Sequence, residues 1–457
     1  MLLLVNMVPR SMSRENAQDS EPSIAVNPAN PQQIVGTAFT PDPFGGPFAP
    51  IYVSTDGGNT WVLNFNVPSQ TMTGDITVAF GSAGNRLYAG ILRRPNPAPN
   101  VIRMNILRTT NFLGPTPMKV LEDRNEVDQP FVQALTIAGK DRVYVGGNDF
   151  NASDGQTATI DRFLNAGIVK PSKRSIRIEA RGTGSANQNG PAIRPACHPD
   201  GTAYGVFYGW RSFNRLTRQV TADVVVVRDD NSGARANPFM ALVDLADGLP
   251  GQRVAQNVTF TWNALLGQQR IGGDVTIAVD PTNSQNVYVA WADQQPAGYT
   301  LHVRRSTTGG QTWSPADLRM IVNGVNPALA INSVGKVGFL YQQVQGNEAA
   351  ARWVTQFDTT TDGGASWTNL VLATVPAGTP DPQFQPYIGD YDQVLAVGQD
   401  FYGIFAANNT PDHANFPNGV TYQRNADFNT HTLLDTDNVT VVPVSIDPFF
   451  FMVTPER

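Results

Sequence analysis

Short apolar runs alternate with turns of Gly, Asn, Asp and Pro along the whole chain. One unit has an apolar strand at residues 76–80, a turn at 81–84, and a strand containing Tyr88 at 86–90. Short runs bounded by turn residues are typical of antiparallel β-hairpins. The pattern recurs seven times, and its apolar first strands are expected at residues 24–26, 76–80, 131–136, 196–197, 275–279, 328–331 and 394–397.

A repeat of this length, with four short strands per unit, is typical of β-propellers. Each unit also offers a third strand that ends in a polar turn, so inner hairpins and outer turns agree on the count. We therefore predict an all-β fold, a seven-bladed β-propeller of four-stranded antiparallel blades. Residues 1–457 are expected to form this single domain.

The longest step between repeats falls in the fourth unit, where about residues 231–272 are expected to form an inserted loop. An open blade would leave unpaired strand edges, so the chain ends should close the ring. Residues 1–5 are the candidate strand that completes the seventh blade beside residues 420–424. The C-terminal tail, about residues 436–457, would then pack on the outside.

Three turns share the spacing S/T-x-D-x-G-x-S/T-W, at residues 54–61, 306–313 and 360–367, and the second has Thr308 where Asp is expected. The Gly pair suits a tight turn, and the Asp can accept hydrogen bonds from backbone amides. The spacing resembles the Asp-box of the sialidase (BNR-repeat) superfamily of β-propellers. In that family the box lies between the third and fourth strands of a blade, far from the reaction centre.

The resemblance implies a glycan ligand without identifying it. Sialidases carry an Arg triad, a catalytic Asp and a Tyr/Glu nucleophile pair, and the first Arg lies in an Arg-Ile/Leu-Pro motif. This chain offers only Arg10 and Arg194 in partly similar contexts, and sialidases have six blades, so no catalytic residue is carried over. Seven-bladed members of the wider group include polysaccharide lyases, rhamnose-releasing enzymes and lectins.

Composition narrows the partners. The net charge of −6 argues against nucleic acid, which needs a basic surface. No apolar stretch approaches the roughly 20 residues of a membrane span. The first residues lack the features of a signal peptide, although a secreted protein whose leader had been removed would look the same, so the compartment stays open. We expect a soluble monomer.

No cofactor is expected. The single cysteine, Cys197, excludes an internal disulfide and a Cys-rich zinc site, and four histidines argue against a His-rich metal centre. A ring of acids could hold Ca²⁺, which takes six to eight oxygen ligands. No loop shows the usual alternating ligands, so calcium is not indicated.

Ligands of propellers meet the face formed by loops that enter the innermost strands and loops that leave the second strands. The repeat register places polar and aromatic residues at equivalent positions in both loop sets, so we expect them to converge on the channel mouth. The residues expected there are Asp75, Asp128, Arg194, Asp274, Tyr387, Asp390 and Tyr391 before inner strands, and Arg93, Arg94, Asp149, Trp210, Arg211, Trp291 and Asp293 after second strands.

Neighbouring carboxylates separate their pKa values, and this separation provides the acid and the base or nucleophile of glycoside hydrolysis. The catalytic candidates are Asp75 or Asp128 as general acid/base, and Asp390 with Tyr387 or Tyr391 on the nucleophile side. The substrate-binding candidates are Arg93, Arg94, Arg194 and Arg211 for a substrate carboxylate, Trp210 and Trp291 for stacking on sugar rings, and Asp149, Asp274 and Asp293. The structural alternative is that an Asp at each inner strand caps backbone amides between blades.

Two hypotheses follow. The first is a sialidase-like glycan-processing protein that acts on a glycoside, including an acidic sugar, at the channel mouth; as an enzyme it would be an exo-sialidase-like glycoside hydrolase or a polysaccharide lyase. The alternative is a non-catalytic, lectin-like carbohydrate-binding or protein-interaction propeller. An enzyme should have one asymmetric central site, whereas a lectin should have several similar sites between blades.

Overall fold

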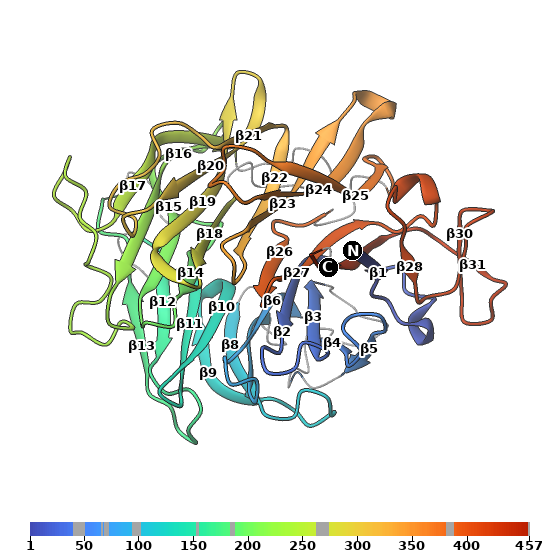
Figure 1. Ribbon diagram of the computed structural model, residues 1–457, viewed down its shortest axis with the longest axis horizontal. Coiled ribbons are helices and arrows are strands. Elements are labelled where there is room, and N and C mark those ends of the chain that lie inside the picture. The colour runs from blue at the N-terminus through green and yellow to red at the C-terminus, as the bar shows by residue number, and fades with distance from the viewer. Residues whose placement is uncertain are drawn as a thin grey trace.

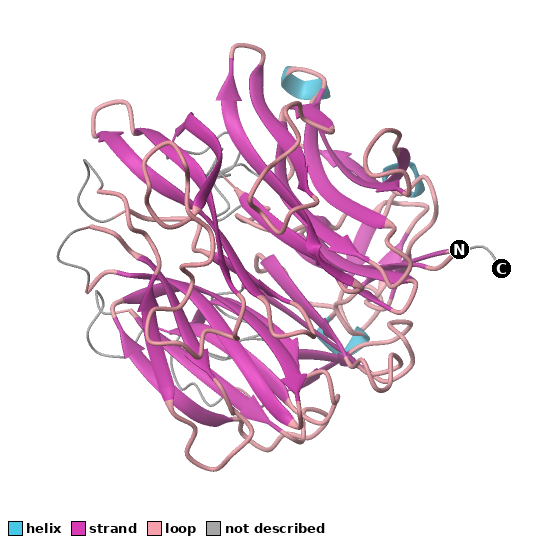
Figure 2. Cartoon of the chain, turned by 60° about the vertical axis from the view of Figure 1, so that its left-hand side comes forward, coloured by secondary structure: helices cyan, strands magenta, loops and turns pink. Residues whose placement is uncertain are grey.

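The computed structural model describes residues 1–39, 51–64, 67, 73–93, 102–151, 155–182, 188–261, 274–380 and 388–455. Within these ranges, seven antiparallel sheets stand around one axis, each with its first strand nearest the centre (Figure 1). Helix is confined, in the same ranges, to short 3-10 turns such as Arg10–Met12 and His413–Asn415 (Figure 2). The prediction of an all-β, seven-bladed propeller of four-stranded antiparallel blades is confirmed.

Six blades are meanders of four strands that follow one another in the sequence. Blades 1 to 3 consist of β2 (Ser20–Val26), β3 (Ile34–Phe39), β4 (Ile51–Ser54) and β5 (Val62–Asn64); β6 (Thr73–Phe80), β7 (Leu87–Arg93), β8 (Arg103–Thr109) and β9 (Lys119–Asn125); and β10 (Val127–Ile137), β11 (Lys140–Asp149), β12 (Ala158–Phe163) and β13 (Lys173–Arg177). Blades 4 to 6 consist of β14 (Arg194–Cys197), β15 (Ala203–Asn214), β16 (Gln219–Asp229) and β17 (Gln252–Thr261); β18 (Val275–Asp280), β19 (Asn283–Gln295), β20 (Gly298–Ser306) and β21 (Arg319–Val322); and β22 (Gly324–Ile331), β23 (Val337–Gln345), β24 (Arg352–Thr360) and β25 (Thr368–Pro376).

The seventh blade joins the two ends of the chain. Its strand order is β26 (Gln393–Val397), β27 (Asp400–Asn408), β32 (Ile446–Val453), β1 (Leu2–Asn6) and β28 (Thr421–Tyr422). The N-terminal strand pairs antiparallel with β32 and parallel with β28, and both ends of the chain lie beside this blade (Figure 1). The N-terminal strand thus closes the ring as predicted.

The prediction that the C-terminal tail packs outside the ring is wrong. Residues 446–453 form the third strand of the seventh blade, between β27 and β1, and residues 420–424 lie beyond β1. Phe449, Phe450 and Phe451 are fully buried because neighbouring blades cover both faces of this strand. The small sheet of β29 (Ala426–Asp427), β30 (Thr432–Leu434) and β31 (Val441–Val442) is separate from the blades.

The predicted insertion is shorter than expected. Residues 252–261 are β17, the outermost strand of blade 4, and pair along β16. Residues 231–251 form turns and an isolated bridge between Val243 and Pro250. The remaining part of the predicted insertion, residues 262–272, lies outside the described residues.

The hydrophobic cores lie between blades. Residues 224–227 of β16 are an unbroken apolar run and all are buried, because each blade is covered on both faces. Trp291 of blade 5 packs in one cluster with Tyr208 and Phe260 of blade 4. The blades are therefore held in fixed orientation, and the inner strands present their ends to the axis in a defined order.

The three S/T-x-D-x-G-x-S/T-W turns join third strands to fourth strands, at the position implied by the resemblance. In the first, Thr60 N donates to Asp56 Oδ1 at 2.9 Å, Gly58 N donates to Ser54 Oγ at 2.9 Å, and the indole of Trp61 donates to Gly58 O at 3.0 Å. The carboxylate and the indole together fix the turn.

The second turn keeps this geometry without its Asp. Thr312 N donates to Thr308 Oγ1 at 2.9 Å, and Trp313 Nε1 donates to Gly310 O at 3.1 Å. The threonine hydroxyl therefore replaces one carboxylate oxygen. These turns stabilise outer strands and lie far from the axis in strand order.

Candidate functional site: an axial carboxylate cluster

Inner strands of four blades bring charged and aromatic side chains together. Arg194, at the start of β14, has its Nη2 atom 3.8 Å from Oδ1 of Asp274, which precedes β18. The guanidinium carbon of Arg194 lies 4.5 Å from the ring centroid of Phe131 and 5.3 Å from that of Tyr391. Blades 3, 4, 5 and 7 therefore meet around one arginine.

Tyr391 faces several carboxylates at this point. Burial, and then the negative charges of Asp75, Glu21 and Asp390, raise the pKa of its hydroxyl well above the usual value. The hydroxyl is buried and has no hydrogen-bond partner among the described residues. We define the axial cluster as Glu21, Asp75, Arg194, Asp274, Asp390, Tyr391 and Asp392.

Asp274 is the titratable centre of the axial cluster. Its Oδ1 atom accepts a hydrogen bond from the amide of Val275 at 2.8 Å, whereas its buried Oδ2 atom has no partner within the described part of the chain. Burial raises the pKa of this carboxyl to about 7; Arg194 and the amide oppose the rise, and Asp390 adds to it. Arg194 is too distant for a hydrogen bond, so it does not offset the loss of water.

Asp392 is a second buried acid with a raised pKa, and the sequence interpretation missed it. Burial raises its pKa well above the ordinary value, although the amide of Ala406 donates to Oδ1 at 3.4 Å. The negative charge of Asp274 adds to the rise. Its buried Oδ2 also has no partner in the ranges described, as is the case for Oδ2 of Asp274 and the hydroxyl of Tyr391.

An unusual backbone starts several inner strands. In blades 1, 3 and 6, the pairing between the first and second strands skips two residues of the first strand. The first skipped residue has a positive φ and precedes a proline; it is Glu21 (50°), Gln129 (53°) or Asn326 (53°). Bulges of this kind redirect side chains, and non-glycine residues with positive φ are enriched at functional sites. A polar residue before Pro at an inner strand is the sequence signal for this feature.

Part of the axial cluster is scaffold. Glu21 Oε1 accepts a hydrogen bond from the amide of Asp390 at 3.2 Å, across the junction of blades 1 and 7. Farther along the same junction, Gln393 Oε1 of β26 accepts hydrogen bonds from Ser23 Oγ at 2.8 Å and from the amide of Ile24 at 2.7 Å. The structural alternative, in which acids cap amides between blades, therefore describes Glu21.

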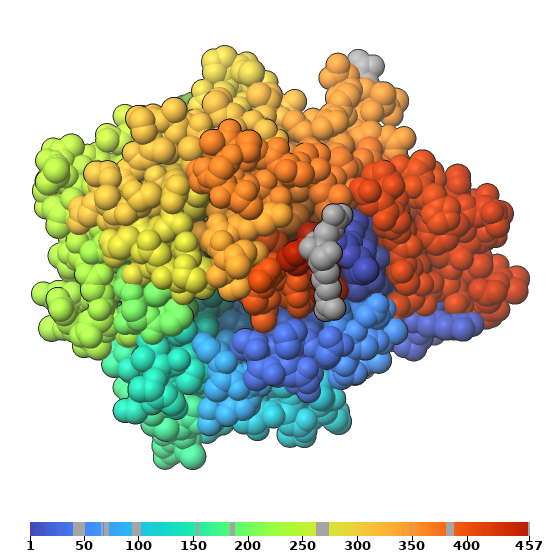
Figure 3. Space-filling model, viewed as in Figure 1, coloured from blue at the N-terminus to red at the C-terminus, as the bar shows by residue number. Residues whose placement is uncertain are grey.

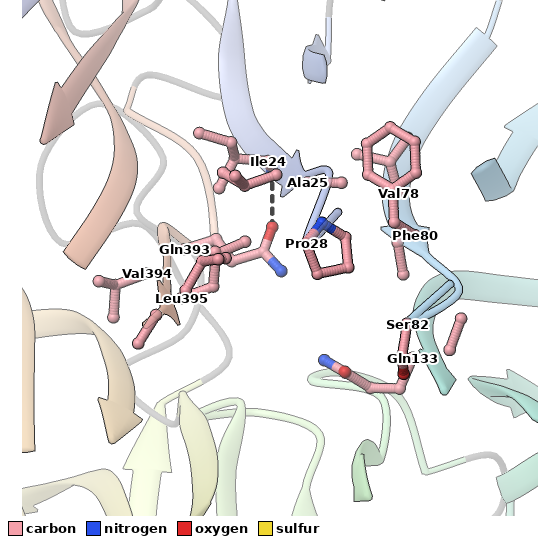
Figure 4. A pocket seen from close by; sticks show the side chains of 15 residues that line it. Ile24, Ala25, Pro28, Val78, Phe80, Ser82, Gln133, Gln393, Val394 and Leu395 are labelled. Atoms are coloured by element: carbon pink, nitrogen blue, oxygen red, sulfur yellow. Dashed lines mark hydrogen bonds between the residues drawn. The ribbon is translucent and has the colours of Figure 1, made fainter. Parts of the chain in front are cut away.

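A cavity of about 260 Å³ is lined by the later residues of β2 and β6, by the middle of β10 and by the whole of β26. Most of the residues that line it have apolar side chains, and Figure 4 shows the amides of Gln133 and Gln393 and the hydroxyl of Ser82 among them. Figure 3 shows a hollow near the middle of one face of the ring. The charged groups therefore gather where the inner strands begin, and apolar groups where they end.

Three predicted residues at the ends of second strands form ion pairs with residues outside the axial cluster. Arg93 Nη2 lies 3.1 Å from Asp123 Oδ2, and Arg211 is held by Glu179 and Asp223 at 2.9 and 3.0 Å. Asp149 pairs with Arg124, which reaches it from the outermost strand of blade 2. These ion pairs are made with residues outside the axial cluster, and a place at the channel mouth stays a prediction for Arg93, Asp149 and Arg211.

The two predicted tryptophans are buried, so neither presents an open face for stacking on a sugar. Trp210 is 3% exposed and packs on Phe213 and Phe260, and Trp291 is 1% exposed and stacks on His302. Neither indole offers a free face at the channel mouth. Side chains at the end of a second strand alternate between the two blade faces, which neighbouring blades cover.

Trp291 and Asp293 instead line a lateral cleft of about 410 Å³ between β17 of blade 4 and β19 and β20 of blade 5. His302, Arg304 and Asp317 complete the blade 5 side of this lateral cleft. Two residues predicted for the channel mouth thus belong to a separate concave surface.

The remaining predicted residues are not assigned to either site. Asp128 is the second residue of β10, and its Oδ1 atom accepts a hydrogen bond from the amide of Gln129 at 2.8 Å. Its catalytic role stays a prediction. Tyr387 and Arg94 lie outside the described residues.

The described residues offer neither a metal-binding group nor a membrane-spanning helix. No group of three or more His, Cys, Asp or Glu side chains is arranged to hold a metal ion there, the axial cluster included. Within the described chain, no helix has the length and apolar character needed to cross a membrane.

Comparison with known proteins gives distant structural likenesses. No family model and no curated protein matches the chain. The α-L-arabinanase of Penicillium chrysogenum complexed with arabinobiose is 13% identical, with TM-score 0.45 over 98% of this chain and 97% of that chain. The phage phi92 endosialidase is 11% identical, with TM-score 0.43 over 100% and 69%. A protein of unknown function from Dyadobacter fermentans is 11% identical, with TM-score 0.45 over 99% and 98%. Likenesses this distant do not identify the ligand or the reaction of this chain.

Proposed function

We propose that residues 1–457 act as one domain that processes glycans, with the axial cluster as the active site of a glycoside hydrolase. The observation that carries the proposal is the pKa of Asp274, about 7, beside other carboxylates, an arginine and an unpaired tyrosine hydroxyl. Groups with perturbed pKa values and unsatisfied hydrogen bonds concentrate at functional sites.

The proposed chemistry needs one acid that is protonated and one that is ionised. Protonated Asp274 would donate its proton to the glycosidic oxygen as the sugar C–O bond breaks. Asp75 or Asp390 would act on the other side of the ring, either removing a proton from water or bonding to the anomeric carbon. Water supplies the hydroxyl group of the released sugar, and its second proton restores the acid.

Asp274 replaces Asp75 and Asp128 as the candidate general acid. A general acid works best when its pKa lies near the operating pH, and burial gives Asp274 this value. Tyr391 and Asp390 keep their proposed place on the nucleophile side, because both border Arg194 or Asp274.

A neutral sugar fits the axial cluster better than an acidic one. Arg93 and Arg211 are held in ion pairs elsewhere, so Arg194 is the one arginine that the described residues place in this cluster. A single arginine among several carboxylates would not favour a sugar carboxylate. The finer sialidase-like assignment is therefore our second choice within this function.

The test is turnover of a panel of aryl glycosides and polysaccharides between pH 4 and 8. Reducing ends report hydrolysis, and ultraviolet absorbance of unsaturated uronates reports elimination. Asp274→Asn should lower kcat by about 100-fold or more. Asp123→Asn, which removes a carboxylate of an outer ion pair, should leave kcat unchanged and is the matched control.

Equal turnover by wild type and Asp274→Asn would refute the assignment. Saturable glycan binding without any turnover would favour the lectin-like alternative. If Asp274 is the acid, kcat/KM should fall as the pH rises through about 7, because the carboxyl loses its proton there.

A further inference from the structure

The lateral cleft between blades 4 and 5 is a concave surface that takes no part in the proposed axial chemistry. Its volume of about 410 Å³ lies within the range of small-molecule pockets, about 300–1,000 Å³. Its walls come from β17 on one side and from β19, β20 and Asp317 on the other. None of these residues belongs to the axial cluster.

One wall of the lateral cleft is a fixed array of charged groups. His302 Nε2 lies 3.1 Å from Asp293 Oδ1, and Nδ1 lies 2.9 Å from Asp317 Oδ2. Burial alone would lower the pKa of the imidazole, but the two carboxylates override it and raise the pKa to about 9. Both ring nitrogens therefore donate, and the ring stacks on Trp291 at a centroid distance of 5.0 Å and an angle of 16°.

Arg304 joins this wall to the opposite one. Its Nε atom donates to Asp317 Oδ1 at 2.8 Å, and Nη1 donates to Val254 O of β17 at 2.8 Å. The guanidinium is thus oriented before any ligand arrives. The buried indole Nε1 of Trp291, a lining residue, has no acceptor among the described residues. A buried unsatisfied donor is unusual enough to require an explanation such as a ligand or water.

The charges of the lateral cleft are balanced. The two cations of the wall face two carboxylates. Arg253 on β17 shares Asp244 and Asp247 with Arg181: the two carboxylates lie 2.7 and 3.3 Å from Arg253, and 3.7 and 2.8 Å from Arg181. A site without net charge has little attraction for an ion of either sign. It instead presents many oriented hydrogen-bond donors and acceptors.

The rim adds flexible amides. Gln256 and Gln295 are exposed and line the opening, and Gln295 Nε2 donates to Asp293 Oδ1 at 2.6 Å. A carboxylate accepts several hydrogen bonds, a guanidinium donates several, and an amide does both. Neighbouring sugar hydroxyls both donate and accept, so they match such a mixed surface.

We propose that the lateral cleft is a second binding site, for an uncharged polyhydroxylated ligand such as one or two sugar rings. The site would hold a glycan outside the axial cluster and would not perform chemistry. It stands apart from the proposed axial function, because binding here needs none of the axial residues.

The experiment measures sugar binding by NMR of the His302 imidazole, which contacts the lateral cleft. The probes are D-glucose, D-galactose, L-rhamnose, cellobiose and maltose as neutral ligands, with D-glucuronate as the anionic comparison. The test variant is Ala255→Trp, which enlarges a lining residue on β17, the wall opposite His302. The control is Ala246→Trp, the same enlargement at an exposed position outside the cleft.

At least one neutral probe should shift the His302 signals with a dissociation constant in the millimolar range or tighter. Ala255→Trp should weaken this binding about tenfold or more, and Ala246→Trp should not. If Ala255→Trp fails to fold, Gln256→Ala is the substitute test variant; this milder change at the rim should also weaken binding of the neutral probe. Asp274→Asn should bind as wild type does, so loss of turnover and loss of cleft binding are distinguishable.

The proposal is overturned if no neutral probe shifts these signals. It is equally overturned if D-glucuronate binds more tightly than every neutral probe, or if Ala255→Trp binds as wild type does.

Discussion

Asp274→Asn should make the protein more stable at alkaline pH, although it removes the proposed catalytic acid. The substitution keeps the size of the side chain and abolishes its charge. In the folded protein the carboxyl has a pKa of about 7, against an ordinary value of 3.8. The folded state therefore binds this proton more tightly than the unfolded state does.

The sign of the pH dependence follows from this difference. The contribution of protonated Asp274 to stability is complete below pH 4 and is lost as the pH rises through about 7. Each tenfold change in proton affinity is worth 1.36 kcal/mol, so the loss amounts to about 4 kcal/mol. That is a large part of a typical stability of about 5–15 kcal/mol.

The assay is urea unfolding of wild type and Asp274→Asn at each pH from 4 to 8. The difference in free energy of unfolding between the two proteins cancels most of the contributions of other groups. We expect the two proteins to be similar at pH 4, and the variant to be more stable by up to about 4 kcal/mol at pH 8.

Asp123→Asn provides the control of opposite sign. Partial burial of Asp123 is outweighed by the hydrogen bond from Arg103 and the charge of Arg93, which hold its pKa below the usual value. Its removal should therefore destabilise the protein at neutral pH, and the effect should fade as the pH falls. A difference between wild type and Asp274→Asn that stays constant from pH 4 to 8 would refute the reasoning.

Three further predictions concern the scaffold and the lateral cleft. Thr308→Asp should raise the free energy of unfolding by about 1 kcal/mol, because a carboxylate adds a hydrogen bond to the second turn; unchanged urea midpoints would contradict this. NMR titration of His302 should give a midpoint of about 9, and Asp317→Asn should lower this midpoint by about one pH unit or more. A wild-type midpoint near 6.5 would contradict the stabilisation of the imidazolium by Asp293 and Asp317. Arg424→Ala should cost about 3–5 kcal/mol in urea unfolding, because the fully buried Asp447 loses its positively charged partner and keeps only neutral hydrogen-bond donors; Arg424→Ala with Asp447→Ala should recover part of this loss.

The inner strands could be predicted from sequence because their signals are local. Each apolar run and its turn lie within about a dozen residues, so hydrophobic alternation and turn chemistry identify them together. The seven first strands were predicted at the positions where β2, β6, β10, β14, β18, β22 and β26 occur.

β32 could not be predicted in the same way. Its partners are β27 and β1, and β1 lies at the other end of the chain. Because both faces of β32 are buried, Phe449, Phe450 and Phe451 form a continuous apolar run without alternation. Such a run does not identify its partner strands, so the sequence pattern indicates only a C-terminal tail outside the ring.

The same distinction between local and non-local signals separates the site residues that could be predicted from those that could not. Arg194, Asp274 and Tyr391 were predicted for the axis and lie together there, because the start of an inner strand is near the axis in any register. Arg211 and Asp293 lie outside the axial cluster, because a shift of one residue moves a side chain to the other face of a strand. The sequence pattern does not determine that register.

The position of a bound glycan tests the central claim most directly. Crystals of Asp274→Asn, grown with the best substrate of the panel, should show a sugar ring within about 3 Å of Arg194 and of the substituted side chain. A glycan that binds at the blade rims or in the lateral cleft, with the axial cluster left without sugar at saturating concentration, would contradict the account.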